Sequence, residues 1–115
     1  MMTFFSELYN QKRGQPGQAA YDSYSDDGAI SVEDGVVFLT KGSAQTMTLA
    51  APSDNGLALT IVCATAQAHV VLNTTPLFNG VGGTITFIAN AGAKTTLHSH
   101  NGTWFGHTGT LATYS

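Results

Sequence analysis

From residue 29 to its last residue, the chain contains short apolar runs separated by turn-forming residues. Polar and apolar residues alternate within several runs, as in Thr-Met-Thr-Leu at 46–49, which is the pattern of a half-buried strand. No segment of this region has the helical period of about 3.6 residues. The pattern predicts strands at 36–40, 46–50, 57–63, 68–72, 84–89, 94–100, 103–107 and 111–114.

Short strands at regular intervals with turns between them are typical of a sandwich or barrel. We therefore predict an all-β chain folded as a single β-sandwich, jelly-roll-like in its arrangement. The run at 57–63 is the most apolar and is expected to be a central strand. No internal repeat is clear enough to indicate a solenoid. The predicted organisation is an extended N-terminal arm at 1–28 and a β-sandwich body at 29–115.

The sharpest local prediction is a hairpin turn at Asn101-Gly102, because this dipeptide favours a type I′ turn with positive φ at both residues. The resulting register places Trp104 opposite Ser99 and on the same face as Leu97. This face is expected to be the core face.

The same register places His98, His100, Phe105 and His107 together on the opposite face of the hairpin. Three imidazoles on one face could bind a transition metal, particularly if repeated about a three-fold axis. The alternative is that they are solvated or packed in an interface. We favour the alternative and predict no metal site and no cofactor.

Aromatic residues are unexpectedly common in the region 1–28, which is otherwise rich in Gly, Gln and Ser. Such a segment can bind a partner by lying across its surface, whereas the alternative is a leader with no binding role. The candidate partner-binding residues are Phe4, Phe5, Leu8, Tyr9, Tyr21 and Tyr24.

Charged residues make up only 10% of the chain, against about 25% in typical soluble domains. Six of the seven acids occur by residue 34. A body with so few charges is typical of a protein whose surface is covered by identical subunits or by a larger assembly. The alternative is a monomer that its hydroxyl and amide groups keep soluble. The net charge of −3 and the four Lys and Arg residues do not favour nucleic-acid binding.

Motifs for catalysis are missing from the sequence, which contains no phosphate-binding loop and no nucleophile elbow. Asp54 is the only acid after residue 34, so paired carboxylates are not expected in most of the body. Cys63, the single cysteine, lies in an apolar run and is expected to be a buried core residue. We predict a protein that is not an enzyme, with no transmembrane helix, no membrane partner and no secretory signal peptide.

Four segments of the body resemble small β-rich virion proteins of tailed bacteriophages, most closely capsid decoration (cement) proteins. They are DGVVFLT at 34–40, MTLAAP at 47–52, GAKTTL at 92–97 and NGTW at 101–104. The resemblance implies a homotrimer on the capsid exterior, made in the host cytoplasm. It would stand at three-fold positions, with arms reaching over neighbouring subunits of the major capsid protein.

Two other classes of function are considered beside this one. A tail fibre or spike segment, or a receptor- or carbohydrate-binding module, would use exposed aromatic residues such as Tyr21, Tyr24 or Phe105. A small β-barrel enzyme is disfavoured by the scarcity of acids in the body.

Overall fold

The computed structural model describes residues 20–73, 78–107 and 109–115, and these residues form ten strands and no helix. No helix among them could cross a membrane. The strands are β1 (Ala20–Tyr24), β2 (Gly28–Ile30), β3 (Gly35–Leu39), β4 (Thr46–Leu49), β5 (Ala58–Cys63), β6 (Val70–Leu72), β7 (Thr84–Phe87), β8 (Lys94–His100), β9 (Thr103–Gly106) and β10 (Ala112–Tyr114).

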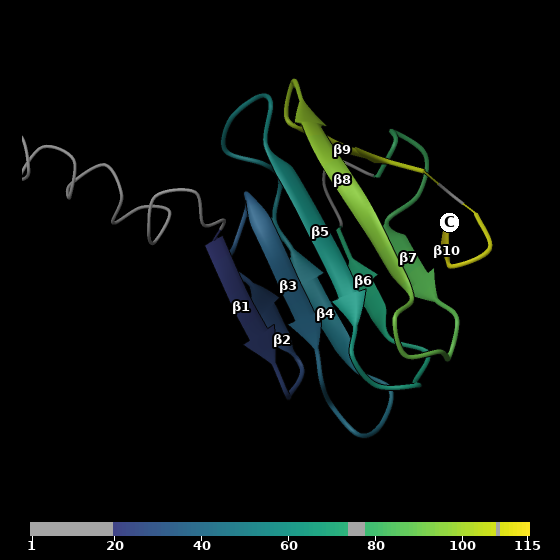
Figure 1. Ribbon diagram of the computed structural model, residues 1–115. Coiled ribbons are helices and arrows are strands. Elements are labelled where there is room, and N and C mark those ends of the chain that lie inside the picture. The colour runs from purple at the N-terminus through teal and green to yellow at the C-terminus, as the bar shows by residue number, and fades with distance from the viewer. Residues whose placement is uncertain (1–19, 74–77, 108) are drawn as a thin grey trace, which may run out of the picture.

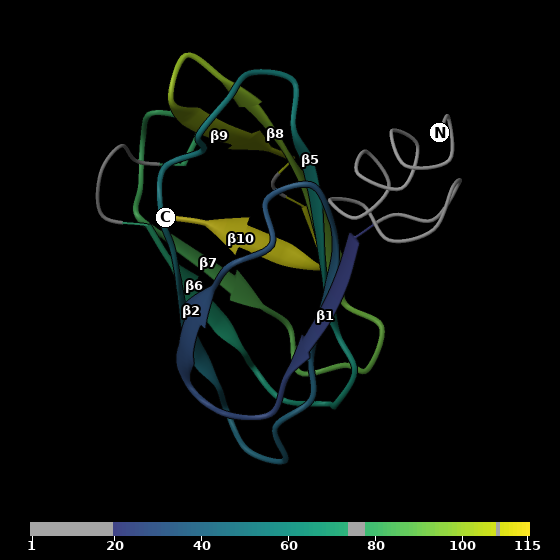
Figure 2. The ribbon, with the colours of Figure 1, turned by 90° about the vertical axis from the view of Figure 1, so that its left-hand side faces the viewer.

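Two five-stranded sheets face each other, and Figures 1 and 2 show them from two directions. The first sheet has the order β1-β3-β5-β8-β9, and the second has the order β10-β7-β6-β4-β2. The predicted all-β class is therefore confirmed. The eight strands expected after residue 29 are present as β3 to β10, and β5 is the central strand of the first sheet.

Strands β1 to β6 alternate between the two sheets along the chain. In the first sheet β1, β3 and β5 run parallel, and in the second sheet β2, β4 and β6 run parallel. This part of the chain therefore forms three stacked coils, each with one strand in either sheet. A jelly roll is built of antiparallel strands, so that part of the fold prediction is not confirmed.

Strands β7 to β10 complete both sheets with antiparallel pairs. The long strand β8 pairs with β5 of the coils on one side and with β9 on the other. In the second sheet, β7 pairs with β6 on one side and with β10 on the other. The molecule thus has a coil half, β1–β6, and an antiparallel half, β7–β10.

The core lies between the sheets and takes alternate residues from both. Trp104 is fully buried and its Nε1 donates a hydrogen bond to the carbonyl of Ala50 at 2.9 Å. Cys63 is also fully buried, and burial raises the pKa of its thiol to about 12. The thiol is therefore protonated at neutral pH, in line with the expected core role.

The predicted hairpin is confirmed in turn, register and facing. Asn101 and Gly102 have φ values of 49° and 77°, and His98 pairs with Phe105. Trp104 pairs with Ser99, on the core side of the first sheet. Local turn chemistry therefore fixed the facing of both strands.

The boundary between arm and body differs from the prediction. Sheet pairing begins at Ala20, where β1 joins β3, and β2 begins at Gly28. Residues 20–28, which the sequence predicts as part of the arm, instead contribute β1 and the first residue of β2 to the two sheets. The remaining arm residues, Phe4, Phe5, Leu8 and Tyr9, lie outside the described residues.

Candidate interaction surface

The outer face of the first sheet is broad and almost uncharged. Register and burial place alternate residues of its five strands on the side away from the core. Lys94 is the one Lys, Arg, Asp or Glu among these outward strand positions. They are Tyr21, Ser23, Val36, Phe38, Ala58, Thr60, Val62, Lys94, Thr96, His98, His100, Thr103 and Phe105.

One half of this face, near β1, is apolar. Tyr21, Val36, Phe38 and Val62 form what we call the outer apolar patch, since they occupy neighbouring outward positions on three adjacent strands. The rings of Tyr21 and Phe38 lie 5.8 Å apart at 58°. Tyr21 retains 66% of its surface exposed, so the patch presents an aromatic ring to solvent or to a partner.

The other half of the face, near β9, carries a shallow groove. Lys94, His98, Phe105, His107 and Leu111 line it together with neighbouring threonine and glycine. Phe105 and Leu111 are exposed in the groove, and the imidazoles of His98 and His107 stand beside them. Within the described residues, no group of three His, Cys, Asp or Glu residues is placed to hold a metal ion.

The outer face of the second sheet is also neutral and is dominated by threonine. Threonines on β4 and β7 flank Val70 and Leu72 of β6, and Thr113 of β10 lies beyond β7. No charged side chain occupies an outward strand position of this sheet in the described residues. These positions are Ala29, Thr46, Thr48, Val70, Leu72, Thr84, Thr86 and Thr113.

Most of the carboxylates lie instead in the loops between strands. Five of the six acids in the described residues lie between Asp22 and Asp34. Asp34 accepts a hydrogen bond from the backbone N–H of Ala58, and Glu33 accepts one from the hydroxyl of Ser53. Both carboxylates therefore fix loop backbone or side chains of the fold.

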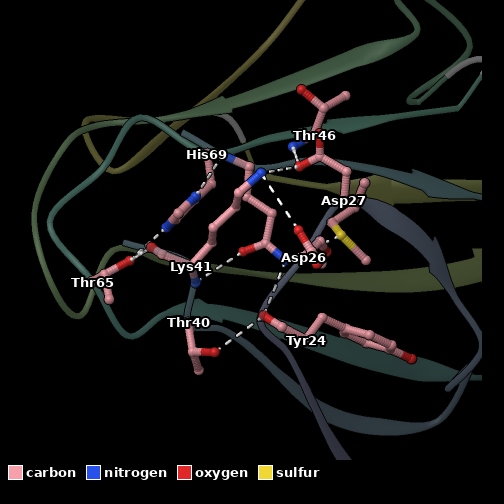
Figure 3. A network of polar contacts seen from close by, with 10 residues as sticks. Tyr24, Asp26, Asp27, Thr40, Lys41, Thr46, Thr65 and His69 are labelled. Atoms are coloured by element: carbon pink, nitrogen blue, oxygen red, sulfur yellow. Dashed lines mark hydrogen bonds and ion pairs between the residues drawn. The ribbon is translucent and has the colours of Figure 1, made fainter. Parts of the chain in front are cut away.

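A buried polar network joins the three successive corners of the coils (Figure 3). Gln45 is fully buried between the first two corners, and its Nε2 donates to the carbonyls of Tyr24 and Asp26 at 3.0 and 2.8 Å. Its Oε1 accepts from the backbone N–H of Lys41 at 3.3 Å. One side chain thus ties the corner before β2 to the corner before β4.

The next corner is joined through His69, which is also fully buried. Its Nδ1 accepts the backbone N–H of Gln45 at 3.1 Å, so its Nε2 carries the proton in the neutral ring. That Nε2–H donates to Thr65 Oγ1 at 2.8 Å, and this hydroxyl donates to the carbonyl of Lys41 at 2.6 Å. Burial lowers the pKa of His69.

Lys41 and Asp27 close the network at the surface (Figure 3). Lys41 Nζ lies 3.2 Å from the carboxylate of Asp27 and 3.7 Å from that of Asp26. Asp27 also accepts the backbone N–H of Thr46 at 3.0 Å, and these hydrogen bonds, aided by the charge of Lys41, lower its pKa. The corner network as a whole was not expected from the sequence.

The two ends of the sandwich differ in how their edge strands are covered. At the end formed by β9 and β10, Asn79 makes two hydrogen bonds to the edge of β9. Its backbone N–H donates to the carbonyl of Trp104, and its Oδ1 accepts the backbone N–H of Gly106, both at 2.9 Å. Gly109 N–H similarly donates to the carbonyl of Ala112 in β10. This closed end leaves little free backbone for another strand.

At the opposite end, seen face-on in Figure 2, β1 and β2 are the outermost strands. The carbonyl of Tyr24 is bound by Thr40 N–H beside β3. Since N–H and C=O groups alternate in direction along a strand, those of Tyr21 and Ser23 point away from the sheet. The N–H of Ser23 donates to its neighbour Asp22 Oδ1 at 2.8 Å, and no strand of the described residues covers this open edge.

Of the predicted partner-binding residues, two lie in the described part of the chain. Tyr21 lies in the outer apolar patch, whereas Tyr24 packs against the core and its hydroxyl accepts Ser31 N–H at 2.9 Å. The structure thus separates two tyrosines that the sequence had placed in one arm. Val36, Phe38 and Val62 were not singled out beforehand, although their alternation with core residues was a usable signal.

Comparison with protein-family models, curated proteins and solved structures gives no match for this chain.

Proposed function

We propose that this protein is a non-enzymatic structural subunit that decorates and stabilises the capsid of a tailed phage. The observation that carries the proposal is the near absence of charge from the outer faces of both sheets. Such faces suit burial against other protein subunits, because few charged groups then have to lose their hydration. The assignment to a phage capsid rests on the resemblance of the sequence segments.

The proposed stabilisation of the capsid follows from the coupling between binding of the subunit and the state of the shell. A subunit that binds only the assembled, expanded shell lowers the free energy of that state by its binding free energy. Many copies on a symmetric lattice add their contributions, so no single contact has to be strong. The outer apolar patch, with Tyr21 exposed beside Phe38, is the part of the face best suited to such contact.

The direct test uses the major capsid protein from the gene's own genome, which we expect to be encoded nearby. Shells assembled from that protein and expanded should retain the full-length chain on sedimentation, to a fixed number of copies per shell. Unexpanded shells should retain less. A chain that stays in the supernatant with both kinds of shell contradicts the proposal.

Two matched substitutions test which face is used. Val62→Lys places a charge in the outer apolar patch, whereas Thr48→Lys places one on the outer face of the second sheet. We expect Val62→Lys to abolish retention by shells and Thr48→Lys to have little effect. Equal retention of both variants would remove the patch from the contact.

The proposal also includes a homotrimer. Light scattering of the full-length chain at micromolar concentration should give about three times the chain mass of 12.0 kDa. A stable monomer at that concentration contradicts this part of the proposal.

A receptor- or carbohydrate-binding role is the second candidate, because the exposed ring of Phe105 stands in the groove beside His98. An aromatic ring in a groove can stack on the apolar face of a sugar. Screening the full-length chain and its Phe105→Ala variant on a glycan array separates this role from capsid binding. Binding of the full-length chain that the variant loses would support it.

A further inference from the structure

At the open edge of β1, a single carboxylate, that of Asp22, occupies a backbone N–H that could otherwise pair with another strand. Tyr21 and Ser23 direct their backbone groups outward, and the Asp22 carboxylate occupies the N–H of Ser23 at 2.8 Å. Asp22 is paired in register with the buried Val37, so its side chain emerges on the core side of the sheet edge. A charge in this position is a known way of keeping edge strands from pairing indiscriminately.

The same carboxylate lacks a cationic partner within the described residues. The ion pairs there join Lys41 to Asp26 and Asp27, and none reaches Asp22. Pairing of β1 with β1 of a second copy, centred on Asp22, would bring two carboxylates together, which is unfavourable. The strand β9 of a second copy is covered by its own Asn79. Pairing of β1 with β1 or with β9 of a second copy is therefore disfavoured.

We propose that the open edge of β1 is a strand-addition site for an extended segment of a partner protein that carries Lys or Arg opposite Asp22. The cation would draw the carboxylate away from the N–H of Ser23 and free that donor for the incoming strand. Alternate apolar residues of the segment would extend the outer apolar patch beside Tyr21. The Asp22 carboxylate would therefore favour a partner segment with a cation at the matching position over one without it.

This inference deepens the proposed function, on which it rests for the identity of the partner as the shell protein. Its chemistry is nevertheless testable without shells. The probe is a nine-residue peptide with valine at positions 2, 4, 6 and 8 and serine at the other positions, except that the central serine is replaced by lysine. The lysine then lies on the opposite face of the strand from the valines. A second peptide with glutamate at the centre is otherwise identical.

Titration into the ¹⁵N-labelled full-length chain should shift the amide signals of Tyr21 and Ser23 saturably with the lysine peptide. The glutamate peptide should bind about tenfold more weakly, because a cross-strand attraction is replaced by a repulsion. Equal binding of both peptides, shifts confined to other strands, or no shifts with either peptide would overturn the inference.

Three variants sharpen the test. Asp22→Lys should reverse the preference between the two peptides. Asp54→Lys is the matched control, since Asp54 makes the same 2.8 Å bond to the N–H of its own next residue, Asn55, but lies outside the strands. It should leave the preference unchanged. Ser23→Pro removes the outward donor without breaking a bond to β3, and should abolish peptide binding.

Sedimentation with shells then separates the two proposals. If the unaltered chain does not sediment with expanded shells, the proposed function fails whatever the peptides show. If the unaltered chain and Ser23→Pro are retained equally, the capsid role stands and the open edge is not the contact. Retention of the unaltered chain and loss of Ser23→Pro supports both.

Discussion

The coil half and the antiparallel half build the same two sheets by different means. In the coil half, equivalent strands are joined through a strand of the opposite sheet, so Gly35 pairs with both Ala20 and Leu59. In the antiparallel half, β8 and β9 are joined by a two-residue turn. Both halves contain pairings between distant residues, but the coil half has in addition side chains that tie its corners, and the antiparallel half has in addition a tight turn between β8 and β9.

The two halves also end differently. The antiparallel half finishes at a closed end, where Asn79 and Gly109 occupy edge backbone groups. The outermost strand of the coil half is β1, where the outward N–H of Ser23 donates to the neighbouring Asp22 and no other described strand pairs with the edge. At one end, backbone and side-chain hydrogen bonds from neighbouring loops occupy the edge strands. At the other end, the carboxylate of Asp22 occupies an outward N–H of the edge strand. Four substitutions or conditions test the contrast between the halves.

The largest expected effect is in the antiparallel half. Trp104→Ala should lower the free energy of unfolding by about 3–5 kcal/mol, since a fully buried indole is removed and its bond to Ala50 is lost. Denaturant unfolding measures the change. The adjacent Phe105→Ala is the control, because that side chain is exposed and should matter little. A loss below about 1 kcal/mol for Trp104→Ala would contradict the central place given to this residue.

The coil half should respond most to its corner network. Gln45→Ala removes the Nε2 donor to the carbonyl of Asp26 and one of the donors to that of Tyr24, and it also removes the acceptor of the Lys41 N–H. We expect a loss of about 2–3 kcal/mol in the free energy of unfolding. Gln67→Ala, at a less buried glutamine of the next corner, should be nearly neutral. Equal effects in denaturant unfolding would mean that the network does not hold the coils together.

The turn of the hairpin provides a smaller test. Gly102→Val should cost about 1–2 kcal/mol, because a β-branched residue resists the φ of 77° at this position. Gly42→Val is the matched change in a coil corner, where φ is not left-handed and a Cβ meets nothing within 4 Å. Thermal unfolding should separate the two variants clearly. Similar melting temperatures would argue that the turn does not set the register.

The smallest effect is a dependence on pH in the coil half. The pKa of His69 is lowered in the folded protein from its ordinary 6.5, so the unfolded chain takes up a proton first as the pH falls. The contribution of His69 is therefore complete above about pH 6.5 and decreases below it. Subtracting the stability profile of His69→Asn from that of the unaltered chain should reveal this slope. His98→Ala should retain it, because His98 is exposed.

What the sequence predicted well was local. Alternation along each run located eight strands, and Asn101-Gly102 set the register of the hairpin, because a turn dipeptide acts on its immediate neighbours. Pairing over longer distances left no such trace. Equivalent residues of successive coils, such as Ala20, Gly35 and Leu59, are separated by 15 and then 24 residues, so no fixed repeat appears.

The candidate surface was predicted in part. The facing of His98 and Phe105 followed from the hairpin, and Tyr21 was singled out for its exposed aromatic ring. Gln45 was not identified, because a polar residue before a strand usually indicates an exposed turn. His69 lies within the predicted strand 68–72, and nothing in the neighbouring sequence marks its imidazole as buried. Their burial depends on the stacking of corners that are far apart in the sequence, which tertiary pairing alone determines.

The burial of Cys63 has a practical consequence for studying this protein. It is the chain's one cysteine, and its backbone groups are bound to Ala93 and Gly92 in the middle of the fold. A thiol reagent can therefore react only while the core is transiently open. The rate of labelling reports how often the core opens in the unaltered chain, free or bound to a shell. Slower labelling in the presence of expanded shells is the result expected from the proposed binding, because a partner that binds only the folded chain stabilises it.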